Sequence, residues 1–217
     1  MEALYDVFLR KTPRQSRSRS VVEAILGATG ERLENADGVD GVTVQQVAER
    51  AGVGIGSLYD YFRDRDGLLA GFAAKVTEDN LRDFEEILAA THTLPLRESV
   101  ERIVDHAFAT YVANTKLPRT IMRIAFTLGF VPTVVESQTS FAQALGRALA
   151  ERKDLKPSLD HQAAAFVLTH AIMGVVLTLI WQEEETVPRA DVRQQLVDLT
   201  CTYLLAPAPP SPGSSPS

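Results

Sequence analysis

The chain has 217 residues, enough for one large domain or two smaller ones, and 45% of them are hydrophobic, so a buried core can form. Its formal net charge of −6 argues against a general, charge-driven nucleic-acid binder. The single cysteine, Cys201, excludes a disulfide framework and a thiolate metal cluster. Because Met1 to Leu9 lacks the charged start and apolar run of a secretory signal, we expect an intracellular, cytoplasmic protein.

The charge is unevenly distributed at the start of the chain. The stretch RKTPRQSRSR, residues 10–19, contains no acidic residue and carries the cations Arg10, Lys11, Arg14, Arg17 and Arg19. A basic segment on an acidic body is typical of a nucleic-acid contact, and a disordered, solubilising terminus is the alternative. We expect residues 1–17 to form a basic, flexible arm.

Apolar residues recur at helical spacing along the rest of the chain, whereas strand signals are scarce. Helices are predicted near residues 20–35, between 43 and 62 (two short ones), and over 64–90, 96–115, 118–128, 133–152, 158–184 and 188–205. The later breaks coincide with prolines, which favour helix starts and disfavour helix interiors. The fold class is therefore predicted to be all-α. The Pro- and Ser-rich residues 206–217 are predicted to form a disordered tail.

The stretch TVQQVAERAGVGIGSLYDYF, residues 43–62, has the pattern of two helices joined by a tight turn. Thr43 can cap the first helix, and Gln46 three residues later completes a capping box. Gly52 stands where a helix ends in the left-handed conformation, and a second helical pattern begins near Gly54. This is a helix-turn-helix unit, whose second helix enters the major groove of DNA with its N-terminal end first.

The second helix of this unit carries no lysine or arginine. Glycines at its start, Gly54 and Gly56, would let the backbone approach phosphates and base edges. Base contacts would then fall to Ser57, Asp60, Tyr61 and Gln45. Attraction to phosphates would come from Arg63, Arg65 and the basic arm.

This segment resembles the DNA-binding domain of the tetracycline-repressor (TetR-type) family of transcriptional regulators. The residues TVQQVAERAGVGIGSLYDYFRDRDGLL and the preceding RQSRSRSVVEAILGATGERL carry the resemblance, which covers roughly residues 14–69. It implies a three-helix DNA-binding domain over residues 18–66, followed by a larger helical ligand-binding and dimerisation domain over residues 67–205. The expected DNA-binding residues are Arg14, Arg17, Arg19, Thr43, Gln45, Gly54, Ile55, Gly56, Ser57, Asp60, Tyr61 and Arg65.

Two positions depart from the family pattern. Gly54 stands where a serine cap is usual, so the recognition helix is expected to fray more. Asp60 stands where a neutral or basic residue is common; an acid repels phosphate, but it can accept a hydrogen bond from cytosine N4. A helical ligand-binding dimer with degenerate DNA binding is therefore an open alternative.

Residues 163–181, AAAFVLTHAIMGVVLTLIW, form an apolar run long enough to cross a membrane. No cluster of Lys or Arg flanks the run, and Thr169 and His170 are unsuited to lipid. We favour a helix buried in a helical bundle, and a membrane-associated signalling protein is the alternative.

The resemblance implies that the last two long helices pair with their copies in a second subunit. The expected dimer-interface residues are Ala164, Val167, Gly174, Trp181, Val192, Leu196, Leu199 and Tyr203. A pocket for a small, apolar or aromatic effector would be lined by bulky side chains with a few polar tips, although each of them also fits plain core packing. The candidates are Phe108, Tyr111, Met122, Phe126, Phe166, His170 and Met173.

The chain shows no phosphate-binding glycine loop, nucleophile elbow or histidine spacing for a metal, so we expect neither enzymatic activity nor a cofactor. The sequence predicts a homodimeric, ligand-released transcriptional repressor that binds a palindromic operator in double-stranded DNA.

Overall fold

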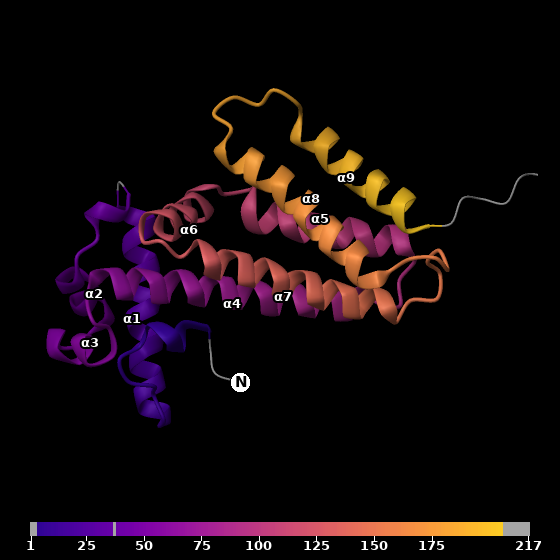
Figure 1. Ribbon diagram of the computed structural model, residues 1–217. Coiled ribbons are helices and arrows are strands. Elements are labelled where there is room, and N and C mark those ends of the chain that lie inside the picture. Colours follow the sequence, from indigo (N-terminus) through magenta and orange to yellow (C-terminus); the bar gives the residue numbers. More distant parts are fainter. Residues whose placement is uncertain (1–3, 37, 206–217) are drawn as a thin grey trace, which may run out of the picture. The chain divides into compact units, whose positions relative to one another are not determined.

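A computed structural model describes residues 4–36 and 38–205, and the predicted tail, residues 206–217, lies outside this part. The described residues form helices (Figure 1), which confirms the all-α class. Their only β-pairing is an isolated antiparallel bridge between Leu9 and Phe62. The elements are the 3₁₀-helices η1 (Leu4–Phe8) and η2 (Val39–Gly41), and the α-helices α1 (Ser16–Asn35), α2 (Val44–Ala51), α3 (Ile55–Tyr61), α4 (Arg65–Thr91), α5 (Leu96–Tyr111), α6 (Lys116–Thr127), α7 (Val131–Ala150), α8 (His161–Trp181) and α9 (Arg189–Leu204).

The chain divides into two compact units, and the boundary expected after residue 66 lies within the first of them. The first unit contains residues 1–83 and 110–138, and the second contains residues 84–109 and 139–217. The start of α4 belongs to the first unit because Leu68 and Leu69 are buried in the same core as the residues of α1 to α3.

The core of the first unit forms where the apolar stripe of α1 meets the helices that follow it. Val22 and Ile25 of α1 are fully buried together with Val47 of α2 and Leu58 of α3. Gly30 permits the close approach of α1 to α4, because a Cβ atom at this position would lie 2.9 Å from the ring of Phe72. Burial of these side chains is the main term that stabilises the unit.

The second unit has its own core, made by α5, α8, α9 and the nearby ends of α4 and α7. Small residues let the helices approach each other, and Ala164 and Ala165 on α8 are completely buried. Cys201 of α9 is also buried, and this burial raises the pKa of its thiol. Cys201 therefore packs as a small apolar residue.

The structure corrects the expectation of a flexible arm for residues 4–17, and residues 1–3 lie outside the described residues. Residues 4–8 form η1, Pro13 is buried, and α1 begins at Ser16 rather than near residue 20. The hydroxyl of Tyr5 donates a hydrogen bond to Glu23 of α1 over 3.3 Å. The N-terminal segment is thus packed on the first unit.

Helix α8 is long and apolar enough to cross a membrane by length and composition, and 39% of its most apolar window is buried within the chain. Its buried side, including Leu168 and Val176, faces the core of the second unit. Its other side, including Val167 and Leu177, is exposed in the single chain. The expectation that α8 is buried in a helical bundle is therefore met, within the single chain, on one side of the helix.

The turn between α2 and α3 gives a test of local geometry. Gly52 has φ of +68°, a region that costs other residues about 1–2 kcal/mol. We expect Gly52→Ala to lower the free energy of unfolding by about that amount, as measured by urea denaturation.

Gly27→Ala is the matched control, because Gly27 lies in α1 with ordinary helical φ and with no atom within 4 Å of an added Cβ. This change should leave stability unaltered or raise it by about 0.5–1 kcal/mol. Equal losses in both variants would contradict the assigned turn geometry.

Candidate DNA-binding interface and apolar cavity

Local hydrogen bonds build the first half of the helix-turn-helix unit. The backbone N–H of Gln46 donates to Thr43 Oγ1 over 3.3 Å, and the N–H of Thr43 donates to Gln46 Oε1 over 3.2 Å. This is the capping box that the sequence predicts. At the other end of α2, the N–H of Gly52 donates to Ala48 and Glu49, and the chain then turns into α3.

Helix α3 presents one face to the core and the other to solvent. Leu58 is fully buried on the inner face, as is Phe62 directly after the helix. The outer face contains exposed residues at five of the predicted DNA-binding positions, while a sixth, Tyr61, is half-buried. The exposed five are Gly54, Ile55, Gly56, Ser57 and Asp60.

The start of α3 is open. Gly54 is the N-cap and supplies no side-chain hydrogen bond to the first amides of the helix. A Cβ atom added at Gly54 or Gly56 would meet nothing within 4 Å, and neither residue has a positive φ. Packing within the chain therefore does not require glycine at these two positions.

Arg65, an expected DNA-binding residue, has hydrogen-bond partners within the chain. Its Nε donates to the carbonyl of Val42 over 2.8 Å, and its Nη2 donates to the carbonyl of Val39. Carboxylate oxygens of Asp40 and Asp66 lie 3.7 and 3.6 Å from its guanidinium. Arg65 therefore fastens the loop before α2 to the start of α4.

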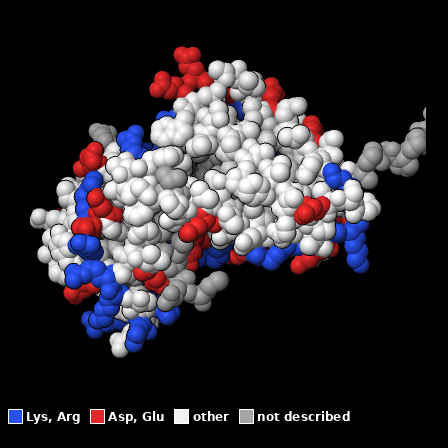
Figure 2. All heavy atoms as spheres, in the orientation of Figure 1, with Lys and Arg blue, Asp and Glu red and all other residues white. Residues whose placement is uncertain are grey.

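The remaining basic positions lie around the start of α1, where Figure 2 shows Lys and Arg side chains gathered. Arg14, Arg17 and Arg19 are all exposed. Arg19 Nε is 3.4 Å from the carbonyl of Pro13, whereas Arg14 and Arg17 form no ion pair among the described residues. Thr43 and Gln45 are exposed at the start of α2.

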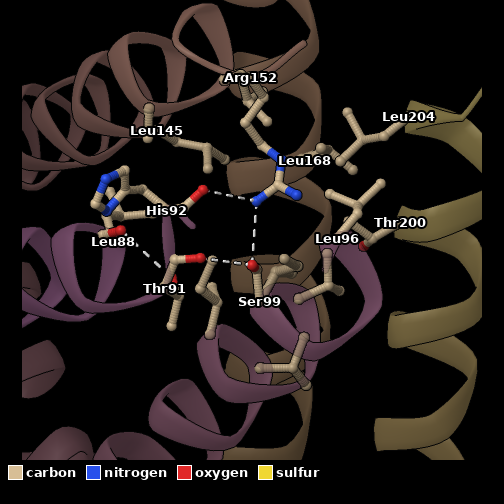
Figure 3. A pocket seen from close by; sticks show the side chains of 16 residues that line it. Leu88, Thr91, His92, Leu96, Ser99, Leu145, Arg152, Leu168, Thr200 and Leu204 are labelled. Carbon is tan, nitrogen blue, oxygen red and sulfur yellow. Dashed lines mark hydrogen bonds between the residues drawn. The ribbon is translucent and has the colours of Figure 1, made fainter. Parts of the chain in front are cut away.

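The second unit contains an apolar cavity of about 50 Å³. Side chains from α4, α5, α7, α8 and α9 line it, and most of them are aliphatic (Figure 3). Leu88, Leu96, Leu145, Leu168 and Leu204 form much of the wall.

Arg152, just after α7, supplies the charge at the edge of this cavity. Its side chain is only 10% exposed and donates to Ser99 Oγ over 3.1 Å and to the carbonyl of Leu94 over 3.0 Å. Its Nε and Nη2 also donate to both carboxylate oxygens of Asp154, over 2.9 and 2.7 Å. Ser99 in turn donates to the carbonyl of Thr91 over 2.8 Å. These bonds connect the turn between α4 and α5 to the end of α7. The guanidinium of Arg152 is therefore occupied by partners within the chain.

None of the predicted effector-binding residues lines this cavity. Phe126 and Phe166 are 62% and 55% exposed. The ring of Phe166 stacks on His170, whose Nδ1 is 2.7 Å from the Phe166 carbonyl. The predicted set is also divided: Tyr111, Met122 and Phe126 belong to the first unit, and Phe108, Phe166, His170 and Met173 belong to the second.

Tyr111 is an example of a predicted effector-binding residue whose environment is explained by ordinary packing. Its burial raises the pKa of the phenol to about 12, although a hydrogen bond with Asn80 opposes this shift. It is an ordinary half-buried tyrosine with a local partner. The cavity itself gave no sequence signal, because aliphatic residues at helical spacing are also the pattern of plain core.

The predicted dimer residues separate into three groups by exposure. Val167, Gly174, Trp181 and Leu199 are exposed, and Leu199 reaches 59%. Figure 2 shows the surface over α8 as nearly free of charged side chains. Val192 and Tyr203 are half-buried, and the Tyr203 ring lies 4.3 Å from Lys156 Nζ.

Ala164 and Leu196 differ from the expectation, because both are buried in the core of the same chain. At 0% and 5% exposure they have almost no surface to offer a second subunit. The two residues instead support the exposed apolar face from beneath.

A capped helix, a left-handed glycine turn and a short helix with an exposed, uncharged outer face define a helix-turn-helix DNA-binding protein. Comparison with known proteins agrees. Residues 27–71 match the family described as bacterial regulatory proteins of the tetR family, and residues 95–204 match the tetracyclin repressor-like C-terminal domain. The chain belongs to the TetR family and is a DNA-binding transcriptional regulator.

Relatives and solved structures support the assignment. The chain is 30% identical to the HTH-type transcriptional regulator BetI of Escherichia coli O17:K52:H18 over 165 residues, which is 74% of this chain and 80% of that one. Its fold is similar to SmeT, the repressor of the Stenotrophomonas maltophilia multidrug efflux pump SmeDEF, with a TM-score of 0.61, 20% identity, and coverage of 94% and 97%. A TetR transcriptional regulator from Rhodococcus sp. RHA1 gives a TM-score of 0.59 at 20% identity, with coverage of 88% and 99%.

The Arg152–Asp154 pair predicts a pH dependence of stability. The hydrogen bond from Arg152 lowers the pKa of Asp154. A lowered carboxyl pKa adds stability above the unfolded-state value of about 3.9, and this stability is lost as the pH falls through the folded-state pKa. We expect Asp154→Asn to shift the urea midpoint down at pH 7, by no more than about 1 kcal/mol in free energy, and to shift it less near pH 3.

Glu151→Gln is the control for this measurement, because Glu151 is a neighbouring exposed acid for which no described residue forms a hydrogen bond or ion pair. Its urea midpoint should follow that of the unaltered protein at both pH values. A loss in Asp154→Asn that is independent of pH would count against the charge-assisted bond.

Proposed function

We propose that this regulator is a repressor, that it acts as a homodimer on a palindromic operator, and that a small apolar effector releases it. The exposed outer face of α3 is the observation that carries the DNA-binding part. It places Ile55, Gly56 and Ser57 together at the front of a short helix whose first amides lack a side-chain cap. Such a helix end suits close approach to a phosphate or a base edge.

The two glycines of α3 support this placement. Packing within the chain does not require a glycine at Gly54 or Gly56. Glycine also weakens a helix by about 0.5–1 kcal/mol relative to alanine. Close approach of the DNA backbone supplies a reason for keeping them. Asp60, exposed on the same helix, would accept a hydrogen bond from cytosine N4 and repel phosphate elsewhere.

The apolar surface of α8 and α9 supports a homodimer. Exposed residues such as Val167, Trp181 and Leu199 form it, and large exposed apolar patches usually mark an interaction site. A second copy would cover it with the same face, since a two-fold interface is self-complementary. Two recognition helices would then meet successive major grooves, about 34–36 Å apart.

The cavity of the second unit is the proposed effector site, in place of the seven residues expected from the sequence. Its wall is aliphatic, and the five donors of Arg152 are engaged by Ser99, Leu94, Asp154 and the carbonyl of His92, which lies 3.5 Å from Nη1. No donor of this arginine is left to pair with an anionic group, so an uncharged aliphatic molecule fits better than a carboxylate. Such a regulator needs no enzymatic activity or cofactor, and its DNA target places it in the cytoplasm.

Fluorescence-anisotropy titration against the DNA that flanks the gene, with scrambled DNA as competitor and at two salt concentrations, tests the proposal. We expect binding to a two-fold symmetric site that is about 10³-fold tighter than to scrambled DNA. Binding no tighter than to scrambled DNA would favour the alternative, a ligand-binding dimer with degenerate DNA binding.

Gly56→Ala separates DNA contact from folding. The added methyl group has open space within the chain, so thermal stability should stay equal or rise. Operator affinity should fall by about tenfold, or ~1.4 kcal/mol, because the methyl group would stand between α3 and the DNA. Gly27→Ala, in an open position on α1, should leave affinity unchanged. Full operator affinity in Gly56→Ala would remove this position from the interface.

The effector site is tested by reducing the cavity. Ala148 lines it, whereas Ala150 on the same helix is exposed and outside it. With 1-decanol and decanoate as probes, we expect 1-decanol to raise the melting temperature of the unaltered protein and of Ala150→Leu, because a ligand stabilises the state that binds it. Ala148→Leu should abolish this shift. An equal shift by decanoate would contradict the inference that the site takes uncharged ligands.

A further inference from the structure

The N-terminal segment, residues Leu4–Arg10, contacts the end of the recognition helix. The backbone N–H of Arg10 donates to the carbonyl of Tyr61 over 2.8 Å, and its Nη1 donates to the carbonyl of Tyr59 over 3.1 Å. Leu9 pairs with Phe62 in an antiparallel bridge. Leu9 and Arg10 therefore contact three residues at the end of the helix-turn-helix unit. These residues are Tyr59, Tyr61 and Phe62.

Helix α3 needs such a contact. It has only seven residues, and isolated helices shorter than about 12–15 residues are marginal in water. The last carbonyls of any helix lack partners within the helix, and Arg10 satisfies two of them here. A cation at the C-terminal end also interacts favourably with the helix dipole. Gly54 gives the opposite end no side-chain cap.

Aromatic contacts hold the segment in place. The ring of Phe8 meets the ring of Phe130 edge to face, with 5.0 Å between centroids. Gly71 of α4 lets this layer come close, since a Cβ atom there would lie 2.9 Å from the Phe62 ring and 3.7 Å from Phe8 Cβ. Phe8 and Phe62 thus both pack against α4 at Gly71.

A hydrogen bond holds the other end of the segment against α1. Tyr5 donates to Glu23, and its burial, together with the charge of Glu23, raises the pKa of the phenol to about 12. The hydroxyl therefore remains a donor at any physiological pH. All these contacts lie within the first unit.

We propose that Leu4–Arg10 is a clasp that sets the position of the recognition helix, with Arg10 as a positioning residue that acts through α3 rather than through a DNA phosphate. The inference goes beyond the proposed function, because it concerns the free protein and holds whatever effector or operator is found. Loss of the clasp should let α3 fray and so lower operator affinity without removing a DNA contact.

A comparison of Arg10→Ala with Lys11→Ala tests the clasp. Both variants lose one positive charge from neighbouring exposed positions, but Lys11 forms no hydrogen bond or ion pair with the described residues. Hydrogen exchange of the α3 amides is measured in the free full-length protein. We expect exchange about tenfold faster in Arg10→Ala, since one net hydrogen bond to a charged group is worth about 1.5 kcal/mol, and unaltered exchange in Lys11→Ala.

Exchange of the α8 amides, in the second unit, serves as the internal reference for global unfolding. Faster exchange in α3 alone supports the clasp. Unaltered exchange of α3 in Arg10→Ala would overturn it.

The salt dependence of operator binding distinguishes a clasp from a phosphate contact. Each neutralised phosphate contributes about 0.9 to the slope of log K against log salt. In Arg10→Ala we expect a lower affinity at every salt concentration with the slope unchanged. A slope smaller by about 0.9, with normal α3 exchange, would show that Arg10 binds DNA directly and would overturn the proposal.

Phe8→Ala provides a second route to the same state without changing any charge. It removes the ring contact with Phe130, in which no residue of α3 takes part. We expect the same faster α3 exchange and the same unchanged slope as in Arg10→Ala. The two effects should be less than additive in the double variant, since both act through one contact. Normal α3 exchange in folded Phe8→Ala would contradict the clasp.

Discussion

The recognition helix cannot stabilise itself, and much of the first unit follows from that constraint. Seven residues with two glycines in or beside the first turn gain too little from their own hydrogen bonds. Leu58 and Phe62, both completely buried, therefore anchor α3 on the shared core of α1, α2 and α4. The inner face of α3 must pack in one position, and that requirement is what fixes the position of the outer face.

Charge plays a smaller part in this unit than in many DNA-binding proteins. The outer face of α3 has no cation, and Arg65 donates hydrogen bonds to the loop before α2. Arg14 and Arg17, near the start of α1, are exposed and are the residues proposed to contact phosphates. On an acidic chain, this arrangement favours recognition that depends on shape and close contact over general attraction to DNA.

Aliphatic residues serve three purposes in the second unit. They fill its core, line its cavity and cover the outer side of α8 and α9. Arg152 borders the cavity, and its donors are engaged by Ser99, Leu94, Asp154 and the carbonyl of His92. A buried guanidinium with satisfied donors costs little and holds the turn between α4 and α5. The cavity can therefore remain apolar although an arginine borders it.

The sequence by itself determined the features that depend on neighbours three or four residues apart. The all-α class, the capping box of Thr43 and Gln46, and the left-handed turn at Gly52 follow from such local hydrogen bonds. They also carry the family pattern. Tertiary structure alone decided that Arg10 meets Tyr59, 49 residues away, and that the leucines near Arg152 enclose a cavity. Helical spacing shows that a residue has an apolar face to bury, but only packing decides whether that face meets core, cavity or surface.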